Sequence, residues 1–564
     1  MASKFSLSSP SDFVPKLLSS LRTGYGPVQL GKDVFAGLTV GVIALPLAVA
    51  FSIGAGGTPA QGLWTAIIAG FSISLLGGSR YQVSGPTGAF VVIIAGVIAQ
   101  HGMGGLIMAT FMAGLMLVAM GLSGLGKLIK FIPYPVTTGF TTGIGLIIAG
   151  GQLKDFFGLT IPDYGSEFFE RIGQTVTHIG SVSPWALALG AGTILTIFLL
   201  RKLAPRLPAA IIAISAAGLA AWAFKLPVET IGSRYGAMPS GLPAFSFPTL
   251  DWATIRAIFP SALTIALLGA IESLLSAVVA DGMTGDRHNA NMELVAQGTG
   301  NILSSFFGGL PATGAIARTA ANIKNGAVSP VSGLVHALVL LAFTLFASGL
   351  ASAIPLAALA AILLVVAWDM SELRRFVNMR TAPKSDLAVM LVTFALTVAI
   401  DLTVAVEVGV FLAIFLFLRR AVETTSIGPV HNLLDADTAP APDDAKDVPP
   451  GTEIYEINGP FFFGTADYLQ DTLDQLERPP DVFILRMRRV PAIDATALNA
   501  LSAFRRHCER RGTRLVLSGV NDQPRAAMER SGFAAELGPE NACPNIGLAI
   551  ARARTILAEG TARG

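Results

Sequence analysis

The chain has 564 residues, of which 52% are apolar and only 13% are Asp, Glu, Lys or Arg, and its formal net charge is +2. This share of charged residues is about half of that in a soluble globular protein, so the composition excludes a disordered chain and a collagen. Two cysteines are too few for a disulfide-rich secreted scaffold, and the near-neutral charge gives no indication of nucleic acid binding.

The charged residues are unevenly distributed along the chain. Residues 1–420 carry 41 of the 76 charges, whereas the last 144 residues carry the other 35. This contrast predicts a large membrane domain followed by a small soluble domain. We expect a cytoplasmic N-terminal segment over residues 1–32, a transmembrane domain over 33–425, a linker over 426–452 and a soluble domain over 453–564.

Apolar segments long enough to cross a bilayer follow one another from residue 34 onward. A membrane-spanning helix needs roughly 20 apolar residues, because each residue rises about 1.5 Å. The predicted spans are 34–53, 62–77, 84–100, 104–123, 131–152, 184–200, 207–224, 259–280, 293–309, 311–325, 327–350, 354–369, 385–401 and 403–420. The polar segment before them lacks the features of a cleaved signal peptide, so we expect it to be retained.

Lysine and arginine residues predict the orientation of these fourteen spans. With the N-terminus inside, the cytoplasmic connections and tails hold eighteen of these residues and the opposite side holds five. Positive residues concentrate on the cytoplasmic side of membrane proteins. We therefore expect both termini in the cytoplasm of a bacterial cell, with the chain in its inner membrane.

An internal repeat relates the two halves of the membrane domain. The third and tenth segments contain the similar stretches Ser84-Gly85-Pro86-Thr87-Gly88-Ala89-Phe90 and Leu310-Pro311-Ala312-Thr313-Gly314-Ala315-Ile316, and their prolines are 225 residues apart. Seven spans repeated once must invert the second copy, because seven is odd. The repeats cover about 33–225 and 258–420, and inverted repeats with interrupted helices are typical of secondary transporters.

The two proline-containing segments predict an anion site. We expect each to be extended up to its proline and helical after it, which leaves a helix N-terminus inside the membrane. Bare amide groups there carry a partial positive charge, and glycine lets an anion approach them. The candidate residues are Gly88 and Ala89 in one segment and Gly314 and Ala315 in the other. The alternative is a pair of proline-kinked helices without a site.

Two ionisable residues lie within predicted spans and extend this hypothesis. Arg318 would add a full positive charge to one helix end, or alternatively reach the membrane surface. Glu272 is the only carboxylate of its span, and such a buried group can take up a proton with the substrate. Ser276 lies one turn further on the same face and could be a co-ligand. The alternative is a structural salt bridge between Glu272 and Arg318.

Other polar residues of the spans have a structural interpretation. Glu293, Gln297 and Asn301 recur every four residues and predict hydrogen bonds between helices. Asn322 is expected to be a structural partner. His336 is expected to be a packed histidine whose ring nitrogens are satisfied.

The last part of the chain predicts a compact α/β domain. Strands are expected at 453–457, 482–487 and 514–518, and helices near 466–476, near 495–510 and twice more towards the C-terminus. No residues in it have catalytic spacing.

The chain as a whole resembles the SulP (solute carrier 26) family of anion transporters. The most specific stretches are Gln82 to Gly88, Glu272 to Asn301 and Ala317 to Asn322. The resemblance implies an α-helical polytopic membrane protein with 14 transmembrane segments in 7+7 inverted repeats, which form core and gate domains, and a small cytoplasmic α/β STAS domain. It places substrate near Thr87, Gly88, Ala317 and Arg318, with Phe51 and Phe90 as walls.

The resemblance also implies a mechanism and partners. The run from Glu272 to Gly285 is closest to bacterial members that resemble the aerobic C4-dicarboxylate transporter, and Glu272 matches the coupling-ion carboxylate. We therefore expect proton-coupled symport of succinate or fumarate by an elevator-type mechanism in a homodimer, with a possible protein partner for the STAS domain and no metal or cofactor. The alternatives are bicarbonate or sulfate uptake coupled to protons or sodium, an uncoupled anion channel, and a nucleobase symporter. Leu47 stands where many sulfate-type members have Gln, and Ala495 after Asp494 departs from the STAS phosphorylation motif.

Overall fold

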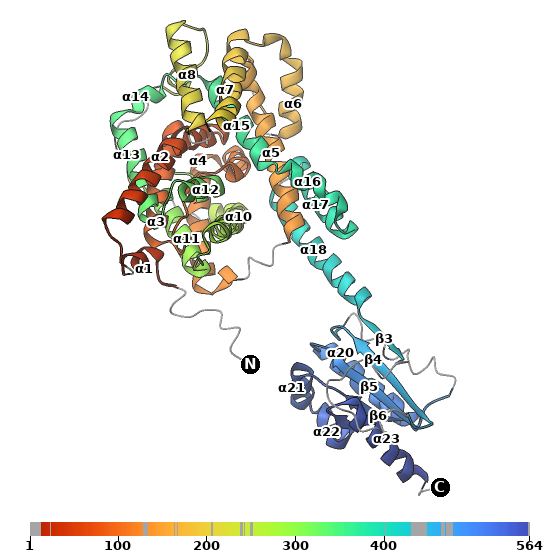
Figure 1. Ribbon diagram of the computed structural model, residues 1–564. Helices are drawn as coiled ribbons and strands as arrows, with labels where there is room; N and C mark the ends of the chain where they lie inside the picture. The colour runs from red at the N-terminus through yellow and green to blue at the C-terminus, as the bar shows by residue number, and fades with distance from the viewer. Residues whose placement is uncertain are drawn as a thin grey trace. The chain divides into compact units, whose positions relative to one another are not determined.

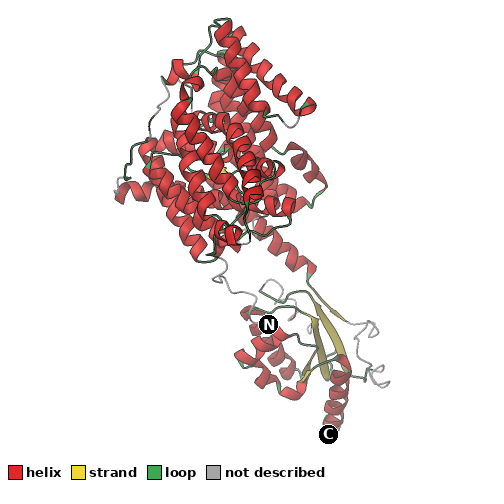
Figure 2. Cartoon of the chain, turned by 60° about the vertical axis from the view of Figure 1, so that its left-hand side comes forward, coloured by secondary structure: helices red, strands yellow, loops and turns green. Residues whose placement is uncertain are grey.

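The computed structural model describes residues 13–22, 24–127, 133–162, 164–165, 167–204, 207–236, 241, 243–248, 252–400, 402–429, 448–463, 469 and 478–561. The chain divides into two compact units, Met1–Phe411 and Leu412–Gly564. The first is almost entirely helical, and the second contains a sheet (Figure 1 and Figure 2). Each unit is considered by itself.

The helical unit contains the same order of elements twice. The first copy consists of α2 (Pro27–Gly54), α3 (Pro59–Leu76), β1 (Ser84–Gly85), α4 (Gly88–Leu122), α5 (Tyr134–Phe157), α7 (Pro184–Leu203) and α8 (Ala209–Ala223). The second consists of α10 (Trp252–Thr284), α11 (Ala290–Phe306), β2 (Thr313–Gly314), α12 (Ile316–Lys324), α13 (Val331–Phe346), α15 (Leu356–Met370), α17 (Lys384–Ala399) and the first part of α18 (Leu402–Thr424), which continues into the second unit. Short helices α1 (Lys16–Arg22), α6 (Phe168–Thr177), α9 (Ile231–Tyr235), α14 (Ser348–Ala351) and α16 (Leu373–Asn378) lie between or before them.

The predicted spans coincide with these elements. Seven helices of the described chain are long and apolar enough to cross a membrane by length and composition, and α8 and α13 are shorter apolar helices. The third and fourth predicted spans form α4, which is interrupted at Gly102, where φ is 67°. The tenth span is β2 together with the nine-residue helix α12.

The two interrupted segments meet through their short strands. β1 and β2 pair in antiparallel register, with Ser84 opposite Gly314 and Gly85 opposite Thr313. Equivalent segments of the two copies therefore run in opposite directions, as an inverted repeat requires.

One of the two helices begins later than the sequence predicts. α4 begins at Gly88, directly after its N-cap Thr87, so the expectation of an extended segment up to Pro86 and a helix after it is confirmed. α12 begins only at Ile316, five residues after Pro311, so the same expectation is wrong for the second segment. The strand pairing extends both segments, and Asn301 satisfies the backbone of Ala312, whose amide donates to Asn301 Oδ1 over 2.8 Å.

Glycine allows the central helices to approach closely. A Cβ atom on Gly114 of α4 would lie 2.8 Å from the Gly298 carbonyl oxygen of α11, and one on Gly298 would lie 2.5 Å from that of Gly114. Gly37 and Gly41 of α2 meet α13 in the same way. Small residues at such positions are characteristic of helix packing in membranes.

The second unit contains a five-stranded sheet in the order β3 (Ser426–Pro429), β4 (Thr452–Asn458), β5 (Val482–Arg489), β6 (Arg514–Ser518) and β7 (Ala542–Cys543). β3 is antiparallel to β4, and the other pairs are parallel. Helices α20 (Ala495–Arg510), α21 (Asp522–Ser531) and α22 (Phe533–Leu537) contribute to the core on one face, and α23 (Ile546–Thr561) covers the other.

The three strands and the helix predicted at 495–510 are confirmed. The predicted linker is wrong at its start, because residues 426–429 form β3 and pair with β4. Polar and proline-rich composition concealed this edge strand. The helix predicted near 466–476 lies outside the described residues.

Candidate functional site

The N-termini of α4 and α12 lie on either side of the crossing formed by β1 and β2. Thr87 is the N-cap of α4 and Ala315 is the N-cap of α12, and neither side chain caps its helix. The first amide groups of a helix have no acceptor within it, so each end carries a partial positive charge. The two ends can together accept an anion.

The structure places the predicted backbone groups differently in the two segments. Gly88 and Ala89 are the first residues of α4, so their amides point out of the helix end. In the other segment Gly314 pairs with β1 and the Ala315 amide donates to the Val83 carbonyl over 3.0 Å. The free helix end therefore belongs to Ile316 and Ala317, both of which are exposed.

Arg318 joins the two halves of the crossing. Its side chain is 3% exposed, and Nη2 donates to the Pro86 carbonyl, whereas buried Nη1 has no partner among the described residues. A Cβ atom on Gly85 would lie 2.7 Å from Nη1, so glycine makes room for the guanidinium. The alternative that Arg318 reaches the membrane surface is wrong, and exposed Lys324 occupies the end of the helix instead.

A second unpartnered polar atom belongs to the residue that follows Pro86. The Thr87 hydroxyl is buried and has no hydrogen-bond partner within the described residues. Buried polar atoms are normally satisfied, so an unpaired donor at such a place indicates room for a ligand.

The predicted hydrogen-bonding face of α11 is confirmed and holds the crossing in place. Glu293 Oε2 accepts from the Gly78 and Ser79 amides over 2.9 and 3.1 Å, and Oε1 accepts from Gln82 and Gln297 over 2.8 and 2.9 Å. Gln297 also donates to the Ser84 hydroxyl over 3.0 Å.

Asn322 is also a structural partner, as predicted. Its Nδ2 donates to the Tyr81 carbonyl over 2.9 Å and to the Ser332 hydroxyl over 2.8 Å.

Glu272 and Ser276 lie on α10, which packs against α12. Glu272 is partly buried, and its carboxylate has neither a hydrogen bond nor an ion pair among the described residues, so the alternative of a salt bridge to Arg318 is wrong. Ser276 donates to the Thr319 hydroxyl over 3.0 Å, and Thr319 also accepts from the Val83 amide over 3.1 Å. Thr319 thus links the helix of Glu272 to the crossing, although no sequence signal distinguished it.

The two predicted aromatic walls have different neighbours. A Cβ atom on Gly88 would lie 3.3 Å from Phe51 Cε1 and 2.6 Å from Met370 Sδ, so Phe51 faces the start of α4. Phe90 is 1% exposed, and its ring tip lies 3.5 Å from the Cβ position of Gly269 on α10. Phe90 therefore packs within the helix bundle.

A cavity of about 450 Å³ lies along α4 and α5, beyond the first turn of α4. Val91 and Ile148 line it, and the Cδ1 atom of Ile148 is 3.6 Å from the Cβ position of Gly88. Gln152, Glu167 and Arg171 line it further away. Ile148 thus separates the start of α4 from this cavity, whose lining on α4 begins at Val91.

His336 differs from its sequence-based expectation. The residue is fully buried, but neither Nδ1 nor Nε2 has a hydrogen-bond partner within the described part of the chain. The prediction of a satisfied ring is therefore wrong; on the α3 side the ring meets Gly70, which has no polar side chain to offer.

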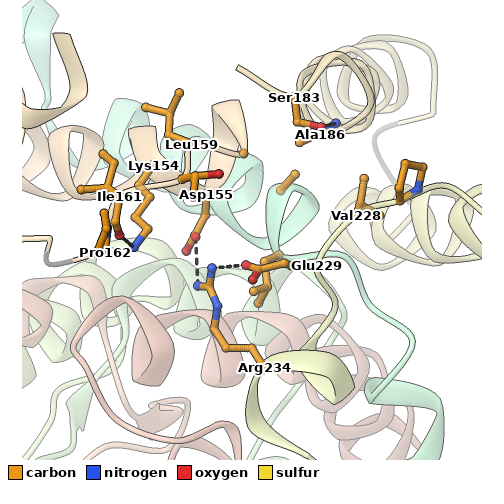
Figure 3. Close-up of a pocket in the computed structure, with 15 residues that line it drawn as sticks. Lys154, Asp155, Leu159, Ile161, Pro162, Ser183, Ala186, Val228, Glu229 and Arg234 are labelled. Atoms are coloured by element: carbon orange, nitrogen blue, oxygen red, sulfur yellow. Dashed lines mark hydrogen bonds and ion pairs between the residues drawn. The ribbon is translucent and has the colours of Figure 1, made fainter. Parts of the chain in front are cut away.

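A separate cavity of about 500 Å³ lies where the connections between α5, α7, α8 and α15 meet (Figure 3). Arg234 pairs there with Asp155 over 2.9 Å and with Glu229. Burial opposes the charge of Arg234, but the two carboxylates outweigh it and raise the pKa of the guanidinium. Arg234 is therefore paired, and the Lys154 ammonium, which also lines the cavity, donates to the Ile161 carbonyl over 2.7 Å.

Asp494 of the second unit has a structural role, and the described residues contain no candidate metal site. Asp494 caps α20 by accepting from the Ala497 amide over 2.8 Å, and it also accepts from the Phe463 amide over 3.1 Å. Across the described residues, no three His, Cys, Asp or Glu side chains cluster as a metal site would require.

Comparison with known proteins gives consistent matches over both units. A model of the sulfate permease family matches residues 30–393, and a STAS domain model matches residues 445–549. The chain is 43% identical to a putative sulfate transporter of Bacillus subtilis over 92% of this chain and 97% of the relative. It is 32% identical to the bicarbonate transporter BicA of a Picosynechococcus species over 88% and 90% of the two chains.

Solved structures agree with these matches. The transmembrane domain of a cyanobacterial bicarbonate transporter BicA is similar with a TM-score of 0.61 and 32% identity, covering 69% of this chain and 98% of that one. The murine solute carrier 26 member A9, an anion transporter in the inward-facing state, is similar with a TM-score of 0.87 over 98% and 97% of the chains. Its 19% identity shows the fold alone.

Proposed function

The chain belongs to the sulfate permease family, and from this premise we propose that it is a secondary active transporter that takes small anions across the inner membrane. The observation that carries the proposal is Arg318, a buried guanidinium with one unpartnered nitrogen between two helix N-termini. A buried cation without a counterion is costly, and an anion removes that cost. Uracil and other neutral nucleobases would leave it in place.

The substrate is proposed to be a small oxyanion, sulfate or bicarbonate. Relatives that cover about nine tenths of this chain carry those names. C4-dicarboxylates are the second candidate, because the stretch from Glu272 to Gly285 resembles that subgroup. All of these anions present negatively charged oxygen atoms, which accept hydrogen bonds from backbone amides and from a guanidinium in the same way.

Transport is proposed to be coupled to protons through Glu272. Its carboxylate has no partner among the described residues and lies on a helix that Ser276 and Thr319 connect to the crossing. An unpaired carboxyl group in a membrane favours its neutral form, so uptake of a proton accompanies entry into the buried state. We propose that a core containing α4 and α12 moves against a gate containing α5 and α15 during transport. The transporter is proposed to be a homodimer with both termini in the cytoplasm.

Uptake into proteoliposomes tests the proposal. Labelled sulfate, bicarbonate and succinate are each offered with and without an inward proton gradient while the membrane potential is clamped. We expect one anion to accumulate only with the gradient, and Glu272→Gln to abolish accumulation but not exchange. Glu407→Gln is the matched control, because Glu407 is an exposed carboxylate of another span. Flux that ignores the gradient in the wild type would indicate a channel, and competition by uracil would refute anion selectivity.

A further inference from the structure

The cavity along α4 and α5 contains two polar side chains that the proposed mechanism does not use. Gln152 of α5 and Arg171 of α6 both line it. Gln152 is 6% exposed, and its carboxamide forms no hydrogen bond among the described residues. Buried polar groups are normally paired, so an unpaired carboxamide at the wall of a cavity indicates a place for a ligand.

Arg171 is held at the wall of this cavity by one nitrogen and by an aromatic ring. Its Nε donates to the Gly165 carbonyl over 2.7 Å, and its guanidinium carbon lies 5.5 Å from the centre of the Tyr164 ring. Within the described part of the chain, Nη1 and Nη2 form no hydrogen bond and the guanidinium forms no ion pair. The N–H donors of both terminal nitrogens are therefore available to a ligand in the cavity.

Glycine residues make room for both side chains. A Cβ atom on Gly151, the residue before Gln152, would lie 3.0 Å from Arg171 Nη1. A Cβ atom on Gly54 would lie 3.4 Å from Gln152 Nε2 and 3.7 Å from Val91 Cγ1 of α4. The guanidinium thus approaches the α5 wall of the cavity, and the carboxamide approaches the α4 wall of the same space.

Arg171 is the one cation among the described residues that line the cavity. Glu167 is the one acidic residue of this lining, and Glu170 follows it on the same segment. Both carboxylates are exposed, and Glu170 accepts from Gln174 over 3.4 Å. Solvent and salt screen exposed charges more strongly than a partly buried one, so we expect a positive potential inside the cavity.

The position of the cavity places it on the path of an anion that enters from outside. Gly54 and Ala399, which line it, are the last residues of α2 and α17. The predicted orientation places the ends of both helices at the outer face of the membrane. Ile148 stands between this space and Gly88, so an anion from outside reaches the cavity before the central site.

We propose that this cavity is a second anion-binding site, in which Arg171 and Gln152 hold a small oxyanion before it passes Ile148 to Arg318. Hydrogen bonds from a guanidinium to an oxyanion are charge-assisted, and the carboxamide adds a neutral donor. The positive charge also raises the local concentration of anions and the rate at which they enter from outside. This inference rests on the proposed function, because it assigns the cavity to the path of the same anion.

A cysteine reporter inside the cavity tests the site without depending on transport. Ser261→Cys places a thiol at the cavity wall with little change in volume, and the two native cysteines are buried. The full-length protein in detergent is treated with a negatively charged sulfonate or a positively charged trimethylammonium methanethiosulfonate. Each rate is divided by that of the same reagent with His178→Cys, an exposed position.

We expect the negative reagent to have the higher normalised rate in the reporter, by roughly tenfold, because the cavity attracts anions. Sulfate at about ten times its Kd should slow that reaction roughly tenfold, because the bound anion occupies the cavity. Bulky gluconate at the same ionic strength controls for screening of the charge and should slow the reaction much less.

Variants of the reporter separate the two proposed ligands from their surroundings. Arg171→Gln should abolish both the charge preference and the protection by sulfate, whereas Gln152→Leu should weaken only the protection. Lys154→Gln is the matched control, because its ammonium lies 5.5 Å from the centre of the same Tyr164 ring but lines the other cavity. This control should match the reporter. Arg318→Gln should retain the protection, which distinguishes the cavity from the central site.

Two results would overturn the inference and leave the proposed function intact. They are an absence of protection by sulfate in the reporter, and a charge preference and protection that persist in a folded Arg171→Gln reporter. In right-side-out membrane vesicles both impermeant reagents should reach Ser261→Cys, and labelling only after the vesicles are opened would overturn the outer placement of the site. Protection by sulfate without uptake of any tested anion would instead overturn the proposed function.

Discussion

Replacing Arg318 by glutamine tests the charge at the centre of the anion site. The guanidinium is 3% exposed, so its interaction with a bound anion is poorly screened. At a contact distance of about 4 Å and an effective dielectric constant near 20, the Coulomb energy is about 4 kcal/mol. One decade of affinity corresponds to about 1.4 kcal/mol. The two helix ends remain in the variant, so we expect KM for anion uptake to rise about 100-fold to 1,000-fold.

The same structure predicts the behaviour of related variants. Arg318→Lys keeps the charge but cannot both donate to Pro86 and present a second nitrogen, so its KM should rise only about tenfold. Lys324→Gln is the matched control, because Lys324 is an exposed cation on the same helix, and its KM should not change.

Initial rates of uptake in proteoliposomes and thermal melting in detergent provide the two measurements. Removal of a buried cation without a counterion should leave the Tm of Arg318→Gln unchanged or raise it. A structural role predicts the opposite, a large fall in Tm. A KM within about threefold of the wild type in a folded Arg318→Gln protein would refute the reasoning.

Three further results are expected from other parts of the molecule. Gly88→Val should slow uptake at least tenfold, because its side chain meets Met370, and adding Met370→Ala should restore part of the rate in the same uptake assay. Glu293→Ala removes an acceptor from four donors, of which only Gln297 keeps another in the Ser84 hydroxyl, and should destabilise the protein by roughly 4 kcal/mol or more, seen as a large fall in Tm that Glu293→Gln only partly reproduces. Burial raises the pKa of the Cys508 thiol to about 12, so at pH 8 its thiolate is only about one part in ten thousand. Disulfide reagents at pH 8 should therefore modify Cys508 only after unfolding in SDS. Rapid reaction of Cys508 in the native protein would contradict the burial of its thiol.

The sequence by itself determined the architecture and the position of the site along the chain. An apolar run of about 20 residues can cross a bilayer as a helix, because a helix pairs its own backbone N–H and C=O groups. The spans were therefore recognisable without tertiary information. The similar stretches around Pro86 and Pro311 located the crossing, because they occupy equivalent positions in the two copies. Each copy has an odd number of spans, so the second copy is inverted in the membrane. The four-residue spacing of Glu293, Gln297 and Asn301 was sufficient to predict the hydrogen-bonded face of α11.

Only the tertiary structure decided which polar groups are satisfied. The strand pairing of Ser84 with Gly314 moved the free helix end from Gly314 and Ala315 to Ile316 and Ala317. Hydrogen bonds between segments more than 200 residues apart depend on three-dimensional approach, which no local pattern encodes. For the same reason the unpaired state of Glu272, the contact between Arg318 and Pro86, and the unsatisfied ring of His336 became visible only once the helices were packed.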